Sequence, residues 1–192
     1  YAPYIQWAKE NGIMDGISDS AFAPEEPIYR ETMALVISDY INAFGYDCIT
    51  VGNHEFDNGM DELARRIRNL DVPVVCANYD FTGSPLEGLV KPYVVVKKAG
   101  KRIGIIGALT DVSTVVDRSV ADMMSYLDPI ESINGYAEYL NNEKKCDLII
   151  CLSHLGYGRG KHTDCEIAPH LKYVDIIVGG HSHTKIDDYT SV

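Results

Sequence analysis

The 192-residue chain has no excess of positive charge, no long hydrophobic run and no paired-cysteine motif. Its 17 Lys and Arg stand against 28 Asp and Glu, a net charge of −11, which disfavours binding to nucleic-acid polymers or anionic membranes because both need a basic surface. No stretch reaches the ~18 apolar residues of a membrane-spanning helix, so we expect no membrane insertion. An anionic substrate stays compatible with the acidic chain, because a bound dication inverts the local field.

The five cysteines form no C-x-x-C motif, and their odd number argues against a complete disulfide framework. Cys48, Cys76 and Cys151 lie in apolar runs and are expected to be buried thiols, with Cys146 and Cys165 nearer the surface. The pattern of a secretory signal peptide is also missing. Because the chain begins without Met, we expect a piece of a longer protein, in which a missing signal carries no information about secretion.

Residues 1–44 differ in pattern from the rest of the chain. Apolar residues at helical spacing predict a helix over 4–11 and another over 29–43, a helix–loop–helix too small to hold its own core. From residue 45 onward, short apolar runs alternate with amphipathic helices, which predicts an α/β fold whose parallel or mixed sheet is covered on both faces. The predicted strands are 48–51, 73–77, 93–98, 102–106, 147–152 and 174–178, and the helices are 59–70, 129–143 and 164–171, with a hairpin turn at 99–101.

Polar clusters follow three of the predicted strands. They are Gly-Asn-His-Glu at 52–55, Ser-His at 153–154 and Gly-His-Ser-His at 180–183. Because ligands of an open α/β sheet bind just beyond the carboxyl ends of its strands, we expect the clusters to share one rim. Amide oxygen and neutral imidazole are suitable ligands for Zn²⁺, Mn²⁺ or Fe, so the pattern predicts a metal site.

Each cluster also has a plainer interpretation. Asn53 and His54 can cap a following helix, with Asp57 within reach of His54 across a turn. A lone histidine at a strand end, such as His154, is more often structural than a ligand. The His-x-His pair at 181–183 carries the strongest signal, because it follows a Val-rich strand and a glycine pair.

Other candidate residues have weaker support. His162 and His170 lie in polar or helical surroundings and are expected to be solvated. Asn78 ends a strand, where a substrate contact and a turn are equally good interpretations. Trp7 is expected in the core rather than in a binding platform.

Residues from 45 to about 189 resemble the calcineurin-like metallophosphoesterases, and in detail their 5′-nucleotidase branch. The motifs that carry the resemblance are Gly45-Tyr46-Asp47, Gly52-Asn53-His54-Glu55-Phe56-Asp57, Ser153-His154-Leu155-Gly156 and Gly179-Gly180-His181-Ser182-His183-Thr184. That branch includes UDP-sugar hydrolases and 2′,3′-cyclic-nucleotide phosphodiesterases. The resemblance implies mixed β-sheet layers flanked by helices, and a metal-dependent hydrolase of nucleotide or other small phosphoesters.

The resemblance also assigns roles to individual residues. The implied metal ligands are Asn53, His154, His181 and His183. The first three hold one divalent ion and the fourth serves a second, the intact family using two ions such as Zn²⁺ or Mn²⁺ to activate a water. His54 and Asp57 form the catalytic dyad that stabilises the transferring phosphoryl group. No residue is assigned to substrate binding.

Two motifs of the family are missing here. The family begins with an Asp-x-His strand and a Gly-Asp motif whose Asp bridges both metals, and neither stands ahead of Asn53. The family's C-terminal nucleoside-binding domain is likewise not among the 192 residues. Two alternatives follow, a catalytically inert truncated hydrolase domain fused to a cell-wall-binding module, and a mononuclear Zn²⁺ domain that uses Asn53, His154, His181 and water.

The first 44 residues resemble a partial S-layer homology repeat. The matching stretches are Trp7-Ala8-Lys9-Glu10-Asn11-Gly12-Ile13-Met14-Asp15-Gly16, Phe22-Ala23-Pro24 and Pro27-Ile28-Tyr29-Arg30-Glu31. Such repeats bind secondary cell-wall polysaccharide, which implies an extracellular, cell-surface or cell-wall-associated protein. We therefore expect a cell-wall-binding repeat at 1–44 and a 5′-nucleotidase-like catalytic domain at 45–192.

Overall fold

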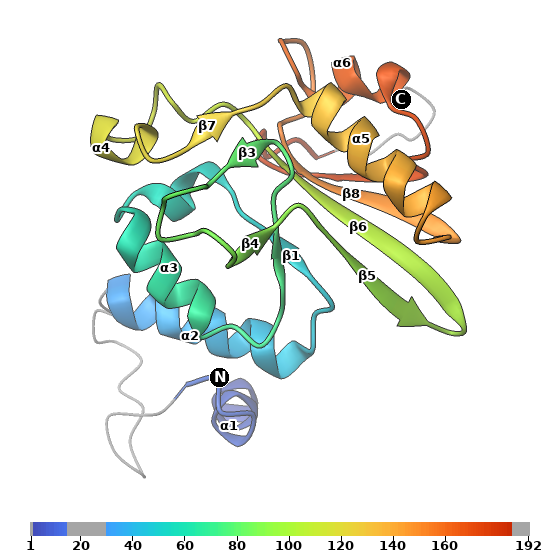
Figure 1. Ribbon diagram of the computed structural model, residues 1–192. Coiled ribbons are helices and arrows are strands. Elements are labelled where there is room, and N and C mark those ends of the chain that lie inside the picture. The colour runs from blue at the N-terminus through green and yellow to red at the C-terminus, as the bar shows by residue number, and fades with distance from the viewer. Residues whose placement is uncertain (1, 15–29, 186–192) are drawn as a thin grey trace.

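The computed structural model describes residues 2–14 and 30–185 (Figure 1). Residues 1 and 15–29 of the S-layer-like segment, which include its Phe22-Ala23-Pro24 stretch, lie outside the described residues. Helices α1 (Ala2–Glu10) and α2 (Arg30–Phe44) precede the first strand, close to the two helices predicted there. Among the described residues, no helix combines the length and the apolar character that crossing a membrane requires.

Strands and helices alternate after α2, as predicted. The strands are β1 (Ile49–Thr50), β2 (Val74–Val75), β3 (Tyr79–Asp80), β4 (Val90–Lys91), β5 (Tyr93–Lys98), β6 (Lys101–Leu109), β7 (Ser125–Tyr126), β8 (Leu148–His154) and β9 (Ile176–Gly179). The helices are α3 (Met60–Arg68), α4 (Arg118–Ala121), α5 (Pro129–Asn142) and α6 (Asp164–Ile167), with 3₁₀ turns at Asn53–Phe56 and Ala168–His170. The strands β3, β4 and β7 are additional to those predicted.

The strands of the described residues form three sheets. Parallel strands in the order β1-β2-β4 form a small sheet, and β5-β6-β8-β9 form a larger one in which only the β5–β6 pair is antiparallel. The third sheet is the antiparallel pair β3–β7. The prediction of a mixed-sheet α/β fold is confirmed, but β1 lies in a different sheet from β8 and β9.

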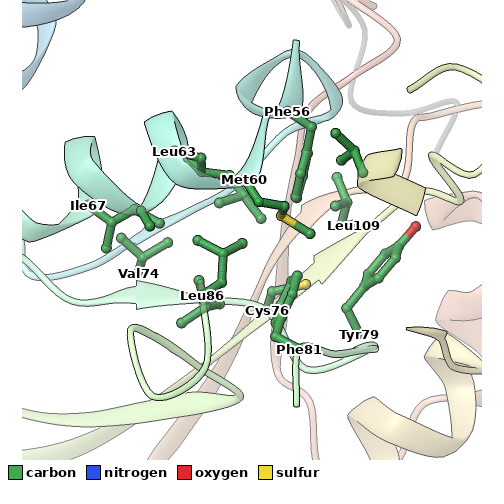
Figure 2. Packing of buried hydrophobic residues seen from close by; sticks show 14 of the residues in the cluster. Phe56, Met60, Leu63, Ile67, Val74, Cys76, Tyr79, Phe81, Leu86 and Leu109 are labelled. Atoms are coloured by element: carbon green, nitrogen blue, oxygen red, sulfur yellow. The ribbon is translucent and has the colours of Figure 1, made fainter. Parts of the chain in front are cut away.

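The two main sheets pack together, with a helix outside each (Figure 1). Side chains alternate along β2, so Val74 points to the core under α3 while Val75 joins the cluster between the sheets. Helix α3 contributes Met60, Leu63 and Ile67 to the first of these cores (Figure 2). Helix α5 covers β6 and β8 in the same way, burying the side chains of Ile133, Ala137 and Leu140 against Ile106, Ala108, Ile149 and Cys151.

The backbones of the two sheets come into direct contact at Gly107 in β6. The amide of Ala77 donates a hydrogen bond of 2.8 Å to the carbonyl of Gly107. A Cβ atom on Gly107 would lie 2.1 Å from the carbonyl oxygen of Val75, a distance that no side chain allows. The sheets therefore approach this closely because residue 107 is glycine.

Residues adjacent in the chain form two of the connections, and one of them, the hairpin turn at 99–101, was predicted. Ala99 and Gly100 join β5 to β6 with φ angles of +48° and +76°, the left-handed conformation of a tight hairpin turn. Asp128 caps α5 by accepting a 3.0 Å hydrogen bond from the amide of Glu131. Both connections are thus specified by residues adjacent in the chain.

Burial differs from expectation at several positions. Trp7, predicted in the core, is 42% exposed and packs edge-on against Phe44 at a ring-centroid distance of 5.7 Å. His162, predicted to be solvated, has a largely buried side chain that hydrogen-bonds to the Tyr126 hydroxyl at 3.1 Å. The cysteines behave as expected, with Cys48, Cys76 and Cys151 buried, Cys146 half-buried and Cys165 exposed.

We expect Gly107→Ala to destabilise the fold by at least about 2 kcal/mol, because the added methyl group must separate the two sheets. Gly135→Ala in α5 is the matched control, since its Cβ would meet no atom within 4 Å and alanine favours a helix by about 0.5–1 kcal/mol. Urea unfolding of both variants measures the difference. Equal stabilities would show that the sheets tolerate a wider separation.

Candidate active site

The polar clusters of the sequence meet at one edge of the molecule. Asn53 begins the 3₁₀ turn after β1, His154 is the last residue of β8, and His181 follows β9 by two residues. The carboxyl ends of β1, β8 and β9 thus form one rim, as predicted, although the strands belong to two sheets. The contact between the sheets is what brings Asn53 to the two histidines.

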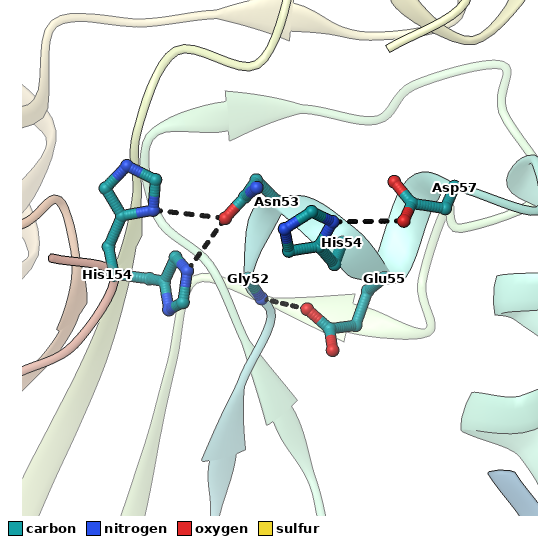
Figure 3. Close-up of polar contacts among 7 residues, drawn as sticks. Gly52, Asn53, His54, Glu55, Asp57 and His154 are labelled. Atoms are coloured by element: carbon teal, nitrogen blue, oxygen red, sulfur yellow. Dashed lines mark hydrogen bonds and ion pairs between the residues drawn. The ribbon is translucent and has the colours of Figure 1, made fainter. Parts of the chain in front are cut away.

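The side-chain oxygen of Asn53 is the centre of this arrangement (Figure 3). His154 Nε2 lies 3.0 Å from Asn53 Oδ1, and His181 Nδ1 lies 3.1 Å from the same atom. Because an amide oxygen only accepts hydrogen bonds, both ring nitrogens donate, which defines the tautomer of each imidazole. Asn53 therefore reaches across to β8 and β9 instead of capping a helix.

The same three atoms can hold a single divalent ion if each ring carries its proton on its other nitrogen. Ligand atoms about 2.1 Å from an ion lie roughly 3–3.4 Å apart, close to the 3.0 Å and 3.1 Å separations from Asn53 Oδ1. Two imidazole nitrogens with one oxygen suit Zn²⁺, Mn²⁺ or Fe. No cluster of three or more His, Cys, Asp or Glu with metal-site geometry occurs within residues 2–14 and 30–185, so the set depends on the amide oxygen of Asn53.

His183 lies apart from this trio. It is exposed, forms no hydrogen bond with other described residues, and lines a cavity of about 420 Å³ together with Tyr157 and Thr184. His181 and His183 have φ angles of +71° and +53°, a left-handed conformation that is uncommon for residues other than glycine. Such backbone strain is concentrated at functional sites, so these two angles support a role for the loop in binding. A second ion site at His183 stays a prediction.

His54 and Asp57 form the pair expected from their spacing. His54 Nδ1 lies 3.0 Å from Asp57 Oδ2, with 81% of the histidine side chain and 51% of the aspartate side chain exposed. Such an exposed pair contributes little to folding stability. Its position beside Asn53 leaves the free Nε2 of His54 open to a bound molecule.

Gly52 and Glu55 support the site, and sequence analysis assigned neither a role. Glu55 Oε2 accepts a 2.6 Å hydrogen bond from the amide of Gly52. A Cβ atom on Gly52 would lie 2.7 Å from His154 Cε1 and 2.8 Å from Glu55 Oε2, so only glycine lets His154 lie this close to the chain. The feature of the sequence that indicates this contact is an acidic residue three positions after Gly52, the residue that precedes the helical turn.

Asn78 is fully buried and takes no part in the site. Its side-chain amide donates to the carbonyl of Leu109 at 2.7 Å and its oxygen accepts from the Leu109 amide at 2.9 Å. The side chain ties the chain after β2 to the end of β6, a role that differs from both interpretations, a substrate contact and a turn.

The charge state of His154 follows from its surroundings. Burial lowers the pKa of this imidazole below its usual 6.5, and the nearby His181 lowers it further. The lowered pKa favours the neutral ring, which is the form that binds a metal.

The lowered pKa of His154 makes stability depend on pH. Below pH 6.5 the unfolded chain binds a proton at His154 before the folded chain does, so stability present above pH 6.5 is lost as pH falls toward the folded-state pKa. We expect the unfolding free energy of metal-free protein to decline less steeply below pH 6.5 in His154→Gln than in the wild type. His170→Gln, which changes an exposed histidine, should keep the wild-type slope. Identical slopes in His154→Gln and wild type would contradict a lowered pKa.

Comparisons with known proteins agree with the fold. The chain matches the family described as "Calcineurin-like phosphoesterase" over residues 15–185, beginning within the segment expected to be a separate repeat. It is 38% identical over 149 residues to a "Probable 5′-nucleotidase" of Treponema pallidum, covering 77% of this chain and 24% of that protein. It is 32% identical over 183 residues to "Protein UshA" of Yersinia enterocolitica, covering 91% and 32%.

A solved structure has the same architecture. The 5′-nucleotidase precursor from Thermus thermophilus superimposes with a TM-score of 0.74 at 36% identity, covering 83% of this chain and 30% of that one. The chain thus spans about a quarter to a third of the length of these relatives. Since the family match extends over most of its residues, this chain belongs to the calcineurin-like phosphoesterases.

Proposed function

We propose that this chain forms part of the catalytic domain of a 5′-nucleotidase-type phosphoesterase, which hydrolyses a nucleotide or another small phosphoester with the help of a divalent ion. The observation that carries the proposal is the convergence of Asn53, His154 and His181 beside the His54–Asp57 pair. The names of the relatives support the substrate class, since a probable 5′-nucleotidase and a 5′-nucleotidase precursor are among them. The catalytic domain at 45–192 is part of this proposal.

Some residues of the site would hold an ion, and others would interact with the negative charge of the phosphoryl group. Asn53 Oδ1, His154 Nε2 and His181 Nδ1 would hold the ion, each ring being neutral with its proton on the other nitrogen. A divalent ion held there would polarise a phosphoryl oxygen as a Lewis acid and would lower the pKa of a bound water. Protonated His54 donates a hydrogen bond to the phosphoryl group, where negative charge accumulates during the transfer. Asp57 holds the imidazole of His54 in one orientation through its contact with Nδ1.

We expect one ion to be held by this chain alone, because the three proposed ligands lie together while His183 lies apart from them. The family's Asp-x-His motif, and its Gly-Asp motif whose Asp bridges two metals, are not in the sequence. The mononuclear hypothesis is therefore favoured over a paired site for these 192 residues. Dialysis followed by metal analysis distinguishes one ion per chain from two or none.

Substitutions at the two parts of the site should have different effects. Asn53→Ala removes a ligand and should lower metal content and turnover of a chromogenic phosphodiester together. His54→Ala should leave metal content near the wild-type value and lower kcat by roughly 10²–10⁴-fold, the range for a positioned proton donor. His170→Ala is a control histidine outside the site.

Equal losses of metal and turnover in His54→Ala would assign His54 as a ligand instead. No metal and no turnover in the wild type would favour the inert domain.

A second candidate function is attachment to cell-wall polysaccharide at the cell surface through residues 1–44. The observation that favours it is a patch of exposed aromatic side chains, the aromatic patch, formed by Trp7, Tyr40, Phe44 and Tyr46. Phe44 stands at its centre, 4.3 Å from Tyr40 and 6.4 Å from Tyr46 between ring centroids. Exposed apolar patches mark interaction sites, and flat aromatic faces stack on the C–H faces of sugar rings.

Sedimentation with purified cell-wall material tests the aromatic patch. We expect the wild-type chain to co-sediment and the double variant Trp7→Ala/Phe44→Ala to lose at least about tenfold in affinity, because stacked aromatic rings contribute more than their area alone. Tyr139→Ala, which removes an exposed ring on α5, should bind like the wild type. A wild-type chain that stays in the supernatant would rule out this attachment.

A further inference from the structure

The proposed mechanism leaves one buried carboxylate without a role. Asp164, the first residue of α6, is only 8% exposed. Burial raises the pKa of its carboxyl group, and the hydroxyl of Ser153 opposes this by hydrogen bonding. A buried charged or titratable group is costly to the fold unless it is well compensated, so the position of Asp164 calls for an explanation.

Asp164 is attached to the end of β8. The hydroxyl of Ser153 donates a short hydrogen bond to Asp164 Oδ1, and the same hydroxyl accepts from the amide of Leu155 at 3.2 Å. The backbone amide of Asp164 donates to the carbonyl of Gly156 at 2.8 Å. These contacts involve residues just before and just after His154 in the chain. Asp164 thus holds the backbone on both sides of His154.

Asp164 also lies against the end of β9. Its Oδ2 would be 2.5 Å from a Cβ atom on Gly179, so the carboxylate rests directly on the glycine backbone. Gly179 is paired with Ser153 in the β8–β9 register and precedes His181 by two residues. The next residue, Gly180, is packed so closely that its Cβ would lie 3.2 Å from His154 Nδ1.

We propose that Asp164 is a positioning residue that sets the separation between the ends of β8 and β9, so that His154 and His181 both reach Asn53 Oδ1. This inference rests on the proposed function, because it concerns two of the three proposed metal ligands. Asp164 touches neither imidazole and acts through Ser153 and Gly179. Removing the Asp164 side chain should therefore change the distance between His154 and His181 without replacing either residue.

The first test measures metal affinity and stability separately. Asp164→Ala should weaken Co²⁺ binding, followed by its visible absorption, by about 10–100-fold, the usual effect of removing a group that orients metal ligands. Ser84→Ala is the matched control, since Ser84 is as buried as Asp164 and donates a 2.7 Å hydrogen bond to the Phe81 carbonyl far from the site. The control should keep wild-type Co²⁺ affinity at a similar loss of thermal stability. Asp164→Asn retains an oxygen for the Ser153 hydroxyl and should recover part of the affinity.

A double-mutant cycle probes the contact with β9. Gly179→Ala should weaken Co²⁺ binding because its methyl group collides with Asp164 Oδ2. In an Asp164→Ala background the collision is gone, so the same substitution should have little further effect. Additive losses in the double variant would contradict the proposed contact.

A third measurement needs no metal. In the metal-free wild type, long-range ¹H–¹⁵N spectra should show the proton on Nε2 of His154 and on Nδ1 of His181, because both rings donate to Asn53. Asp164→Ala should shift both rings toward averaged tautomers. If the wild type binds no Co²⁺ but its tautomers depend on Asp164, the proposal of a metal site is wrong. The proposed positioning role of Asp164 is then still supported. Unchanged tautomers and unchanged Co²⁺ affinity in folded Asp164→Asn and Gly179→Ala would overturn the role, even if Asp164→Ala fails to fold.

Discussion

The close backbone approach of the two sheets at Gly107 is the constraint on which the candidate site depends. A hydrogen bond between the Ala77 amide and the Gly107 carbonyl, with no side chain between the strands, places β1 next to β6 and β8. Asn53 follows a strand of the small sheet and His154 ends a strand of the larger one. The distance between their side chains therefore depends on the distance between the two sheets. A layer of ordinary side chains at residue 107 would move the amide oxygen away from both imidazoles.

The site combines buried supports with exposed reactive groups. His154 lies close to Gly52, and the strand ends beside it rest on the buried carboxylate of Asp164. His54 and Asp57 face solvent and add little to stability, which suits groups that must contact a bound molecule. Rigid surroundings for the proposed ion ligands and open access for the His54–Asp57 pair agree with the hydrolysis proposed for this site.

Local signals predicted the elements whose conformation depends on neighbours in the chain. The helix α5 and the hairpin turn at Ala99 and Gly100 were predicted from the sequence, because each is stabilised within a few residues. The strands β3, β4 and β7 were missed because each pairs an apolar with a polar residue outside any apolar run, whereas the equally short β1 and β2 lie within apolar runs at 48–51 and 73–77. Trp7 was placed in the core because its apolar character says nothing about whether a neighbouring surface covers it.

The sequence by itself determined the alternation of strands and helices, the order of the three polar clusters and the His54–Asp57 pairing, because periodicity and short spacing encode them. Only the tertiary structure decided that Asn53 comes from a separate sheet, that His181 joins His154 while His183 stays apart, and that Asp164 lies against both strand ends. These contacts join residues far apart in the chain, and they depend on how closely the backbones pack. The identity of a single residue does not show how closely its backbone packs until its neighbours in space are known.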